Sequence, residues 1–426
     1  MKKIAAVIAE YNPFHNGHQY LLRQIRQISG ADYILVVMSG DYVQRGEPAV
    51  YDKYTRTRMA LAGGADAVIE LPVACATGSA RRFAEGAIAI LNITGVVQEL
   101  WFGSETGDTG FFLRTSQYLS AETDFFKEAL QQYLKSGMSY PAAREKALRD
   151  VGVFPDENAV RAFRSPNDIL GLEYCIALNR TGSFIIPHTI QRIGEAHDAD
   201  ITRSIPSSPA SGNTSALIDR TIYQAYRAVS ASTIRRQISK TLRIDDSLKP
   251  YIPAEVLSIM EEASFVDPGS ADALFSFALH YQLMKETVHS VSRYLDVPAD
   301  LARRIINHMY DFSSLHTFAE TLKTKNTTRT QINRALLHII LGIRQDDFLS
   351  AVRPKYLRLL GFRKESEPLL KMIKDNASAP LTTRVLSIPG GYSVCDFNAS
   401  TLYENAKSEI CGTRFVHEYE QQVIIV

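Results

Sequence analysis

Hydrophobic residues in the first part of the chain come in short continuous runs of strand length, separated by stretches with helical spacing. Lys2 to Glu10 is the first run, and apolar positions then recur from Gln19 to Ser29 with the period of an amphipathic helix. Further strand-length runs lie at 32–40, 66–72, 99–105 and 183–192, and helical spacing recurs at 52–62, 79–93 and 167–178. Strands that alternate with helices predict right-handed βαβ units, so we expect an α/β fold built on a Rossmann-like parallel sheet.

This pattern changes twice along the chain. From Thr109 to about Gly152 it is helical and charged, which predicts a helical insertion within the first domain. Beyond Leu242 the alternation stops, and helical spacing dominates at 254–263, 270–285, 301–309 and 328–341. We therefore predict two domains, residues 1–242 with the sheet and residues 243–426 mainly α-helical. Apolar pieces at 383–388 and 423–426 are expected to add a small sheet, and the Ser-, Pro- and Gly-rich residues 201–215 a loop.

Composition narrows the class of protein without naming a function. The formal net charge is +1, so contact with a nucleic acid would need a local basic patch. The four cysteines, Cys75, Cys175, Cys395 and Cys411, are far apart and form no Cys-x-x-Cys pair, which favours free thiols over a disulfide frame or a zinc site. No apolar run approaches the ~18 residues of a membrane span, so we expect a cytoplasmic protein with no membrane partner.

The turn after the first strand carries two histidines, His15 and His18, at the expected start of a helix. A helix start offers unpaired N–H groups and a positive dipole end, which suits phosphate. Two imidazoles there can hold the charge that builds on a nucleotide's phosphates during adenylyl transfer. The alternative is a pair of surface histidines without a role. The four residues His-x-Gly-His after a first strand resemble the signature of the nucleotidylyltransferase superfamily, which includes the class I aminoacyl-tRNA synthetases.

A second motif, Ser230 to Arg236, combines small hydroxyl residues with arginine. Hydroxyl side chains cap a helix and donate hydrogen bonds, and the arginine fork fits phosphate. The alternative is an ordinary helix cap followed by an exposed basic face. The same superfamily carries a similar hydroxyl–arginine motif late in its nucleotide-binding domain, where it holds the distal phosphates. On this resemblance Ser232, Thr233 and Arg235 are expected on the β/γ side of the nucleotide.

Further blocks narrow the resemblance to one family. Residues 9–18, 39–46, 102–105 and 165–167, together with 323–334, resemble the bacterial tRNA(Met) cytidine acetate ligase family. The resemblance implies a nucleotidylyltransferase-type sheet and an enzyme that uses ATP to convert acetate into acetyl-adenylate, releasing pyrophosphate. The acetyl group would then pass to the exocyclic amine of the wobble cytidine in elongator methionine tRNA, giving N4-acetylcytidine.

The resemblance also implies the site residues. The ATP-binding loop would be formed by Val7, Ile8, Ala9, Glu10, Tyr11, Asn12, Pro13, Phe14, His15, Asn16, Gly17, His18, Gln19 and Tyr20. Further nucleotide contacts would come from Gly103, Asn167 and Arg192. His15, His18 and Arg235 are the predicted catalytic residues, because they would neutralise charge on the leaving pyrophosphate. A Mg²⁺ ion bridging the phosphates is expected, although no carboxylate cluster in the sequence identifies its ligands.

A tRNA-binding surface is predicted in the helical domain. Thr321 to Lys374 contains twelve Lys and Arg against four Asp and Glu, a net charge of +8 in a chain of net charge +1. Such asymmetry suits an RNA backbone, and we select Lys323, Lys325, Arg329 and Arg334 as tRNA-binding candidates. The alternative is a solvated helical face.

Some assignments stay open at this point. Asp41, Gln44, Arg45 and Lys53 follow the second strand and either contact acetate, phosphate or tRNA or form a solvated loop. Glu105 ends the fourth strand, either as a loop cap or as a site residue. Two rival functions remain: a nucleotidylyltransferase that joins AMP to a small phosphorylated cofactor precursor, and a non-catalytic RNA-binding protein with a degenerate nucleotide fold. Pyrophosphate exchange that depends on acetate would separate the acetate ligase from both.

Overall fold

The computed structural model describes residues 2–121, 123–153, 160, 163, 165–192, 228–325, 327–388 and 393–426. The predicted loop at 201–215 lies outside these residues.

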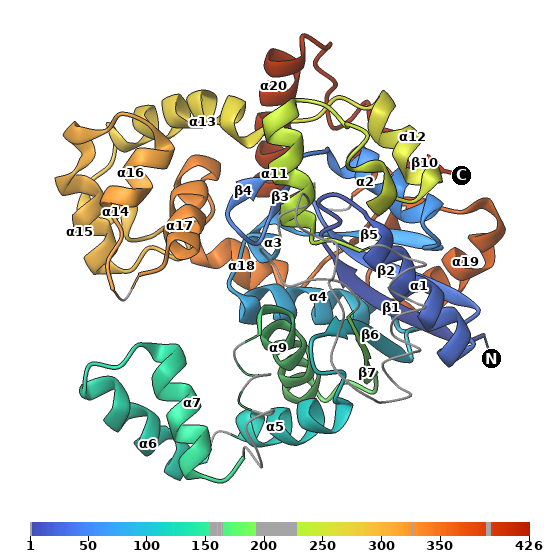
Figure 1. The fold of residues 1–426 in the computed structure, drawn as a ribbon, viewed down its shortest axis with the longest axis horizontal. Coiled ribbons are helices and arrows are strands. Elements are labelled where there is room, and N and C mark those ends of the chain that lie inside the picture. The colour runs from blue at the N-terminus through green and yellow to red at the C-terminus, as the bar shows by residue number, and fades with distance from the viewer. Residues whose placement is uncertain are drawn as a thin grey trace.

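A single large sheet forms the centre of the molecule (Figure 1). Its five parallel strands are β1 (Ile4–Ala9), β2 (Tyr33–Ser39), β5 (Ala67–Leu71), β6 (Glu99–Ser104) and β7 (Ile186–Gln191). They lie in the order β5-β2-β1-β6-β7, so the chain leaves β1 towards one edge and later returns past it towards the other. All five strands and the α/β class predicted from the apolar runs are confirmed.

Both faces of this sheet are covered, which explains why its strands read as continuous apolar runs. Along β1, Ile4 and Ala6 belong to one hydrophobic core, and Ala5 and Val7 belong to another. The second core is closed by helices α1 (Asn16–Ser29), α2 (Lys53–Ala62), α11 (Ala231–Thr241) and α12 (Ala254–Glu262). The first core is closed largely by α3 (Val73–Ala76), α4 (Ala80–Thr94) and α9 (Pro166–Thr181).

The predicted helical insertion is present between β6 and β7. It consists of α5 (Thr109–Ala121), α6 (Asp124–Lys135) and α7 (Tyr140–Asp150), at the lower left of Figure 1. Phe111 and Phe112 of α5 join the core beneath α9, so the insertion is anchored to the sheet.

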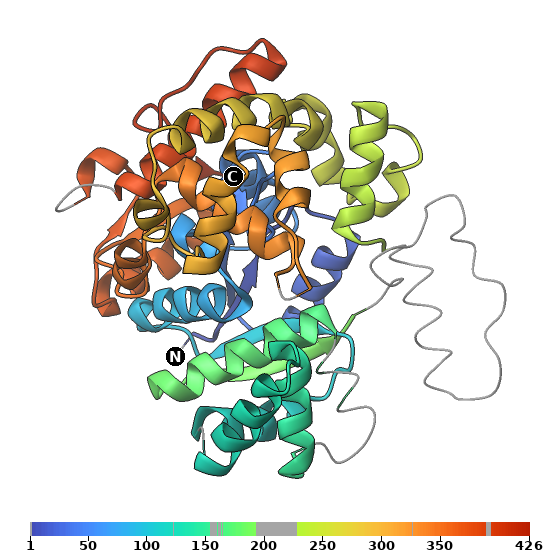
Figure 2. The same cartoon turned by 90° about the vertical axis from the view of Figure 1, so that its left-hand side faces the viewer.

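A second group of helices follows α12 and has its own core. Leu279, Leu301, Phe318 and Ile332 are buried together in that core. Figure 1 shows this group extending to the left, and Figure 2 turns it towards the viewer. Its elements are α13 (Pro268–Leu283), α14 (Val288–Val291), α15 (Ala299–Asn307), α16 (Leu315–Thr321) and α17 (Arg329–Leu341). A short 3-10 turn, η3 (Met309–Asp311), lies within this group, and another, η2 (Lys249–Tyr251), precedes α12.

The chain then returns to the sheet, which the sequence pattern did not predict. After α18 (Gln345–Ala351), strand β8 (Leu357–Phe362) pairs antiparallel with β5. β9 (Leu381–Thr382) and β10 (Ile424–Ile425) pair with β8, so residues 423–426 extend the central sheet instead of forming a small separate one. The strand expected at 383–388 was wrong, because Val385–Ser387 is a 3-10 turn. The remaining elements are η4 (Lys364–Ser366), α19 (Glu367–Asn376) and α20 (Val394–Cys411).

A short hairpin connects the sheet to the second helical group. Its strands are β3 (Tyr42–Val43) and β4 (Glu47–Pro48), and Gly46 lies in its turn with φ of +76°. A Cβ atom added at Gly46 would lie 2.4 Å from the backbone nitrogen of Arg334 in α17. Only glycine therefore allows this close approach, which places the residues after β2 against the helical group.

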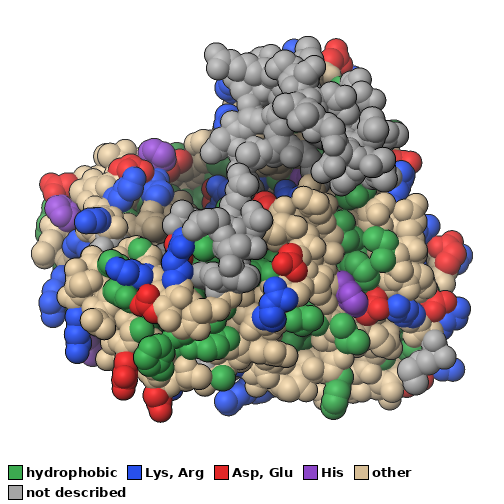
Figure 3. All heavy atoms as spheres, turned by 60° about the horizontal axis from the view of Figure 1, so that its bottom comes forward, with side chains coloured by type: hydrophobic (Ala, Val, Ile, Leu, Met, Phe, Trp, Pro, Cys, Tyr) green, Lys and Arg blue, Asp and Glu red, His purple; other side chains and the backbone are tan. Residues whose placement is uncertain are grey.

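The surface has no single dominant charge on the side shown in Figure 3. That view looks onto the bottom of Figure 1, and its Lys and Arg side chains are interspersed with Asp and Glu, as the net charge of +1 leads one to expect. Within the described residues no helix is both long and apolar enough to span a membrane.

Candidate active site

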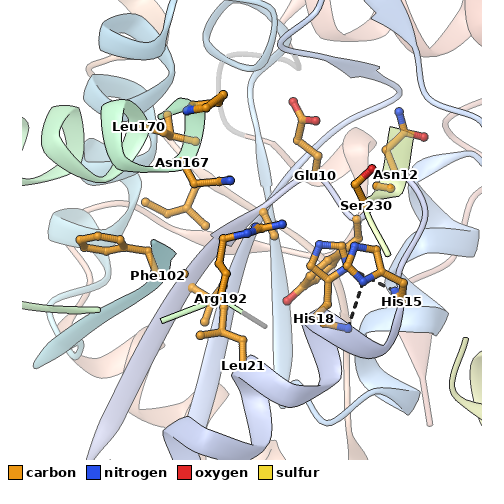
Figure 4. Close-up of a pocket in the computed structure, with 18 of the residues that line it drawn as sticks. Glu10, Asn12, His15, His18, Leu21, Phe102, Asn167, Leu170, Arg192 and Ser230 are labelled. Carbon is orange, nitrogen blue, oxygen red and sulfur yellow. Dashed lines mark hydrogen bonds between the residues drawn. The ribbon is translucent and has the colours of Figure 1, made fainter. Parts of the chain in front are cut away.

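A cavity of about 520 Å³ opens where β1, β6 and β7 end, which is the edge of a parallel sheet where ligands bind. Three helices begin at its walls: α1 contributes Gly17 and His18, α9 contributes Asn167, and α11 contributes Ala231 after its cap Ser230. Figure 4 shows several of these side chains converging from different elements. Helix N-termini carry positive dipole ends, so the cavity is suited to a polyanion.

The two predicted histidines form the start of α1 and face each other. His15 is the N-cap, and its Nδ1 accepts the Gly17 N–H at 3.0 Å. The His18 Nδ1 accepts the backbone N–H of His15 at 3.2 Å, and the two rings stack with centroids 3.8 Å apart. Because each Nδ1 accepts a hydrogen bond, the proton of each neutral ring lies on Nε2. Both rings therefore offer an N–H donor, and both line the cavity.

The surroundings keep both imidazoles neutral in the free protein. Burial, together with the charges of Arg192 and Arg235, lowers the pKa of His15 to about 3. Burial, His15 and Arg192 lower the pKa of His18 well below its usual value. The histidines therefore act on an anion as neutral hydrogen-bond donors, while the arginines supply the positive charge.

We expect the buried His15 to make the protein less stable in mild acid. Its pKa is lower in the folded state, so the unfolded chain binds more protons as the pH falls below about 6.5. His15→Asn keeps a side-chain cap but removes this titration. The unfolding free energy of the native protein, measured by urea titration relative to this variant, should fall by about 2 kcal/mol between pH 7 and pH 5. A difference between the two proteins that does not change with pH would contradict a neutral His15.

The His15 ring leaves no room for a side chain at position 17, so glycine is required there. A Cβ atom there would lie 2.9 Å from the Cε1 of His15. We expect Gly17→Ala to displace the His15 ring and to lower the rate of any adenylyl transfer at this site by about 10- to 100-fold, because a misplaced donor no longer meets the phosphate. Steady-state kinetics would measure the effect. Gln27→Ala, on the exposed face of the same helix, is the control and should leave the rate unchanged.

The hydroxyl–arginine motif meets the histidine turn. Nη1 of Arg235 donates to the backbone oxygen of Asn12 at 2.7 Å, which ties α11 to the turn after β1. Arg235 and Ser230 line the cavity. The hydroxyls of Ser232 and Thr233 lie 2.8 and 2.9 Å from the Ser230 hydroxyl, and neither residue lines the cavity. The hydroxyl residue that lines the cavity is therefore the helix cap Ser230, whereas the sequence predicts Ser232, two residues later.

The opposite wall is built from β6, β7 and the start of α9. Glu105 accepts the side-chain amide of Asn167 at 2.5 Å and the backbone N–H of Asp168 at 3.2 Å, so it holds the first turn of α9 in place. Burial, together with the charge of Glu105, raises the pKa of Asp168 to about 6. Gly103 allows close approach, because a Cβ there would lie 3.1 Å from Cγ of Arg192. Glu105 is therefore both a loop cap and a cavity residue.

The structure brings most of the predicted site residues together. Those that line the cavity are Val7, Ile8, Ala9, Glu10, Tyr11, Asn12, His15, Gly17, His18, Gly103, Asn167, Arg192 and Arg235. Those that do not are Pro13, Phe14, Asn16, Gln19, Tyr20, Ser232 and Thr233. Phe14 and Tyr20 instead belong to the hydrophobic core beneath α1. Their place in the motif thus reflects packing of the helix start.

Sequence reasoning left other cavity residues unassigned. The cavity residues Phe102, Tyr174 and Ser230 are not among the predicted site residues, and the sequence leaves the roles of Gln44 and Arg45 open. Position near the carboxyl end of a strand could have indicated three of them, since Phe102 lies in β6 and the hairpin residues Gln44 and Arg45 follow β2. Lys53, also undecided, is fully buried away from the cavity in an ionic cluster.

No metal site of the protein's own is apparent in the described residues. They contain no group of three or more His, Cys, Asp or Glu side chains placed to hold an ion. Among the described residues, the cavity is lined by histidine and arginine donors and by two carboxylates, Glu10 and Glu105, a set that does not fit the oxygen cage preferred by Mg²⁺.

The four tRNA-binding candidates have different surroundings. Lys323 and Lys325 are exposed between α16 and α17. Arg329 pairs with Glu320, and Arg334 is largely buried against Asp296, at 3.3 Å. The basic block is also divided, because Arg358 is buried beside Glu418 and α19 lies on the opposite side of the molecule from α17 in Figure 1. The expected single basic surface was therefore wrong.

Comparison with known proteins agrees with this geometry. The family model described as HIGH Nucleotidyl Transferase matches residues 1–215 and 213–415. The tRNA(Met) cytidine acetate ligase of Acetivibrio thermocellus is 37% identical over 401 residues, 92% of this chain and 90% of the relative. That of Caldicellulosiruptor saccharolyticus is 37% identical over 98% of this chain and 96% of its own length.

A solved structure gives the same result. Thermotoga maritima TmcAL bound with alpha-thio ATP superposes with a TM-score of 0.83 at 27% identity, over 100% of this chain and 99% of the other. The matches extend over the sheet and the helical group alike. This chain therefore belongs to the HIGH nucleotidyl transferases and, among them, to the tRNA(Met) cytidine acetate ligase family.

Proposed function

We propose that this protein activates acetate with ATP and acetylates the wobble cytidine of elongator methionine tRNA in the cytoplasm. The observation that carries the proposal is the convergence of three helix N-termini, two neutral imidazoles and three arginines on one cavity. The relatives named as tRNA(Met) cytidine acetate ligases supply the choice of acetate and of tRNA.

The chemistry of the first step fits the residues present. Acetate is ionised at neutral pH and can attack the α-phosphate of ATP without a base. The protein must hold acetate in line with the leaving pyrophosphate and neutralise the charge that develops there. The Nε2–H groups of His15 and His18, with Arg235 and the start of α11, are placed to do so. Mg²⁺ would enter with the phosphates of ATP, and no step here depends on it.

One incubation tests the function directly. Purified protein, ATP, labelled acetate and total bacterial tRNA should give label in N4-acetylcytidine of elongator methionine tRNA. Label in another nucleoside, or no label in tRNA, would contradict the proposal. Pyrophosphate exchange into ATP should require acetate, whereas exchange that needs a phosphorylated cofactor precursor would favour the rival transferase.

The exposed lysines between α16 and α17 are the proposed tRNA contacts. Replacing Lys323 and Lys325 together by alanine should weaken tRNA binding, and the slope of log affinity against log salt should flatten by up to about 2, since each phosphate contact releases counterions. Filter binding at several salt concentrations measures both quantities. ATP binding should persist, because neither lysine lines the cavity. Lys2→Ala, near the N-terminus on the other side of Figure 1, is the matched control. Unchanged tRNA affinity would contradict the assignment.

A further inference from the structure

The cavity that receives anions also contains the carboxylate of Glu10, which the resemblance places in the ATP-binding loop but which has no chemical role in the first step described above. Glu10 follows β1 and extends from its end into the region shown in Figure 4. Its Oε1 accepts the backbone N–H of Gln44 at 2.8 Å. No hydrogen bond from its other oxygen to another group is found within the described part of the chain. A negative group so placed would repel phosphate or acetate, so it requires a different partner.

The other cavity carboxylate has a structural task. Both oxygens of Glu105 bind the start of α9, through Asn167 and Asp168. Glu10 is therefore the cavity carboxylate, among the residues that the structure describes, with an oxygen left for a ligand. Since it follows the same strand as the histidine turn, it lies beside the place where the activated acyl group forms.

Gln44 adds a second group beside Glu10. It lines the cavity, and its side-chain nitrogen Nε2 has no hydrogen-bond partner within the described residues. A buried amide N–H without a partner is unfavourable, so a ligand acceptor would stabilise it. A carboxylate acceptor next to an amide donor matches the edge of cytosine, whose N4 amine donates and whose N3 accepts.

We propose that Glu10 binds the exocyclic amine of the target cytidine and takes its proton during acetyl transfer, while Gln44 donates to N3 of the same base. The proposal rests on the proposed function. As the amine nitrogen attacks the acetyl carbonyl of acetyl-adenylate, a C–N bond forms and the C–O bond to AMP breaks. AMP leaves with the electron pair, and one N4 proton passes to the Glu10 carboxylate.

This arrangement also selects the base. Uracil presents an oxygen acceptor where cytosine presents the amine, and an N–H donor where cytosine presents N3. With uracil, the Glu10 carboxylate would face an oxygen that also only accepts hydrogen bonds. The Gln44 amide N–H would face a ring N–H that also only donates. A site with this pair therefore prefers cytosine before any reaction occurs.

The charges around Glu10 are consistent with a proton acceptor. Burial raises its pKa, whereas the Gln44 N–H and the charges of Arg235 and Arg56 lower it and that of Glu47 raises it. Burial raises the pKa of the Tyr174 hydroxyl, and the charge of the nearby Glu10 raises it further. The carboxylate is thus surrounded by α11, α2, the hairpin and α9.

Glu10→Gln tests the assignment by separating the two half-reactions. Glutamine keeps the size and one acceptor but cannot take a proton, so acetyl transfer to tRNA should fall by about 100-fold or more. Acetate-dependent pyrophosphate exchange should fall far less than transfer does, so the ratio of transfer to exchange should drop. The native transfer rate should rise with pH through the ionisation of Glu10, and the variant should lack this rise. Gln44→Ala should raise the KM for tRNA at least tenfold without changing exchange.

Controls keep the outcomes distinct. Glu255→Gln, exposed on α12, should leave both half-reactions unchanged. If Glu10→Gln reduces exchange and transfer equally, Glu10 serves the nucleotide or its Mg²⁺ and the inference is overturned. If the variant transfers acetate at the native rate with an unchanged pH profile, the inference is also overturned. If the native protein shows no acetate-dependent exchange, it is the proposed function that fails.

Discussion

Replacing His18 by alanine is expected to reduce acetate-dependent pyrophosphate exchange by about 100- to 1,000-fold, the usual loss when one donor to a developing charge is removed. The His18 ring offers Nε2–H to the cavity because its Nδ1 accepts the His15 backbone N–H at 3.2 Å. Alanine removes both interactions. Because the ring is neutral in the free protein, the loss should be nearly the same at pH 7 and pH 8.

The alanine variant also loses a cap, so a second variant is needed. His18→Gln places at the third helical position a side chain that can accept the His15 N–H, as in a capping box. It should recover thermal stability but not exchange activity. His308→Ala, at the end of α15 and away from the cavity, is the control for loss of a histidine. Near-normal exchange in His18→Ala would exclude the imidazole from the reaction.

The strands of the central sheet could be predicted because their environment is two-sided. Val7 and Ala6 are neighbours in β1 yet belong to different cores, so every position is apolar and the run is continuous. The helices between these strands are also marked in the sequence, because α2 ends at Gly63 and α4 ends at Gly95. Local sequence is therefore sufficient for this half of the fold.

The return of the chain to the sheet could not be predicted by the same means. β8 is only six residues long and includes Arg358, which is buried beside Glu418. Its place depends on antiparallel pairing with β5, which lies far away in the sequence, and periodicity carries no information about such pairing. The change in hydrophobic pattern predicts a domain boundary after Leu242, and the pairing of β8 with β5 crosses that boundary.

The site shows the same contrast between local and distant information. His15, Gly17 and His18 are fixed by one turn, and the sequence alone places them together. At the second motif the residue types were informative but the register was not. Ser230 caps α11 at the cavity, whereas Ser232 and Thr233 fold back onto it. Which hydroxyl faces a ligand depends on where the helix begins, and such boundaries are poorly defined by sequence.

Lys53 illustrates a polar residue whose task only the folded chain reveals. Its side chain is fully buried, with Nζ 2.8 Å from Glu70 in β5 and 2.9 Å from Glu418 near the C-terminus. It also donates to the Ser400 hydroxyl of α20 at 2.9 Å. The ammonium thus joins the end of a central strand to the last part of the chain. Nothing in the residues around Lys53 indicates partners so distant in the sequence.

Replacing Lys53 by methionine is expected to lower the free energy of unfolding by about 3–5 kcal/mol, because the buried carboxylates of Glu70 and Glu418 would lose the ammonium group that they share. Urea unfolding at pH 7, followed by circular dichroism, measures the loss. Lys127→Met, on the exposed face of α6, should change the unfolding free energy by less than about 0.5 kcal/mol.

The double variant Lys53→Met, Glu70→Gln separates loss of charge balance from loss of packing. Removing one carboxylate relieves part of the uncompensated charge, so the double variant should be more stable than Lys53→Met alone. If the single variant fails to fold, recovery of soluble folded protein in the double variant would likewise show that the uncompensated charge is the cause. A double variant that is less stable than the single one would mean that Lys53 acts through packing, and the C-terminal segment would then not be held to β5 by charge.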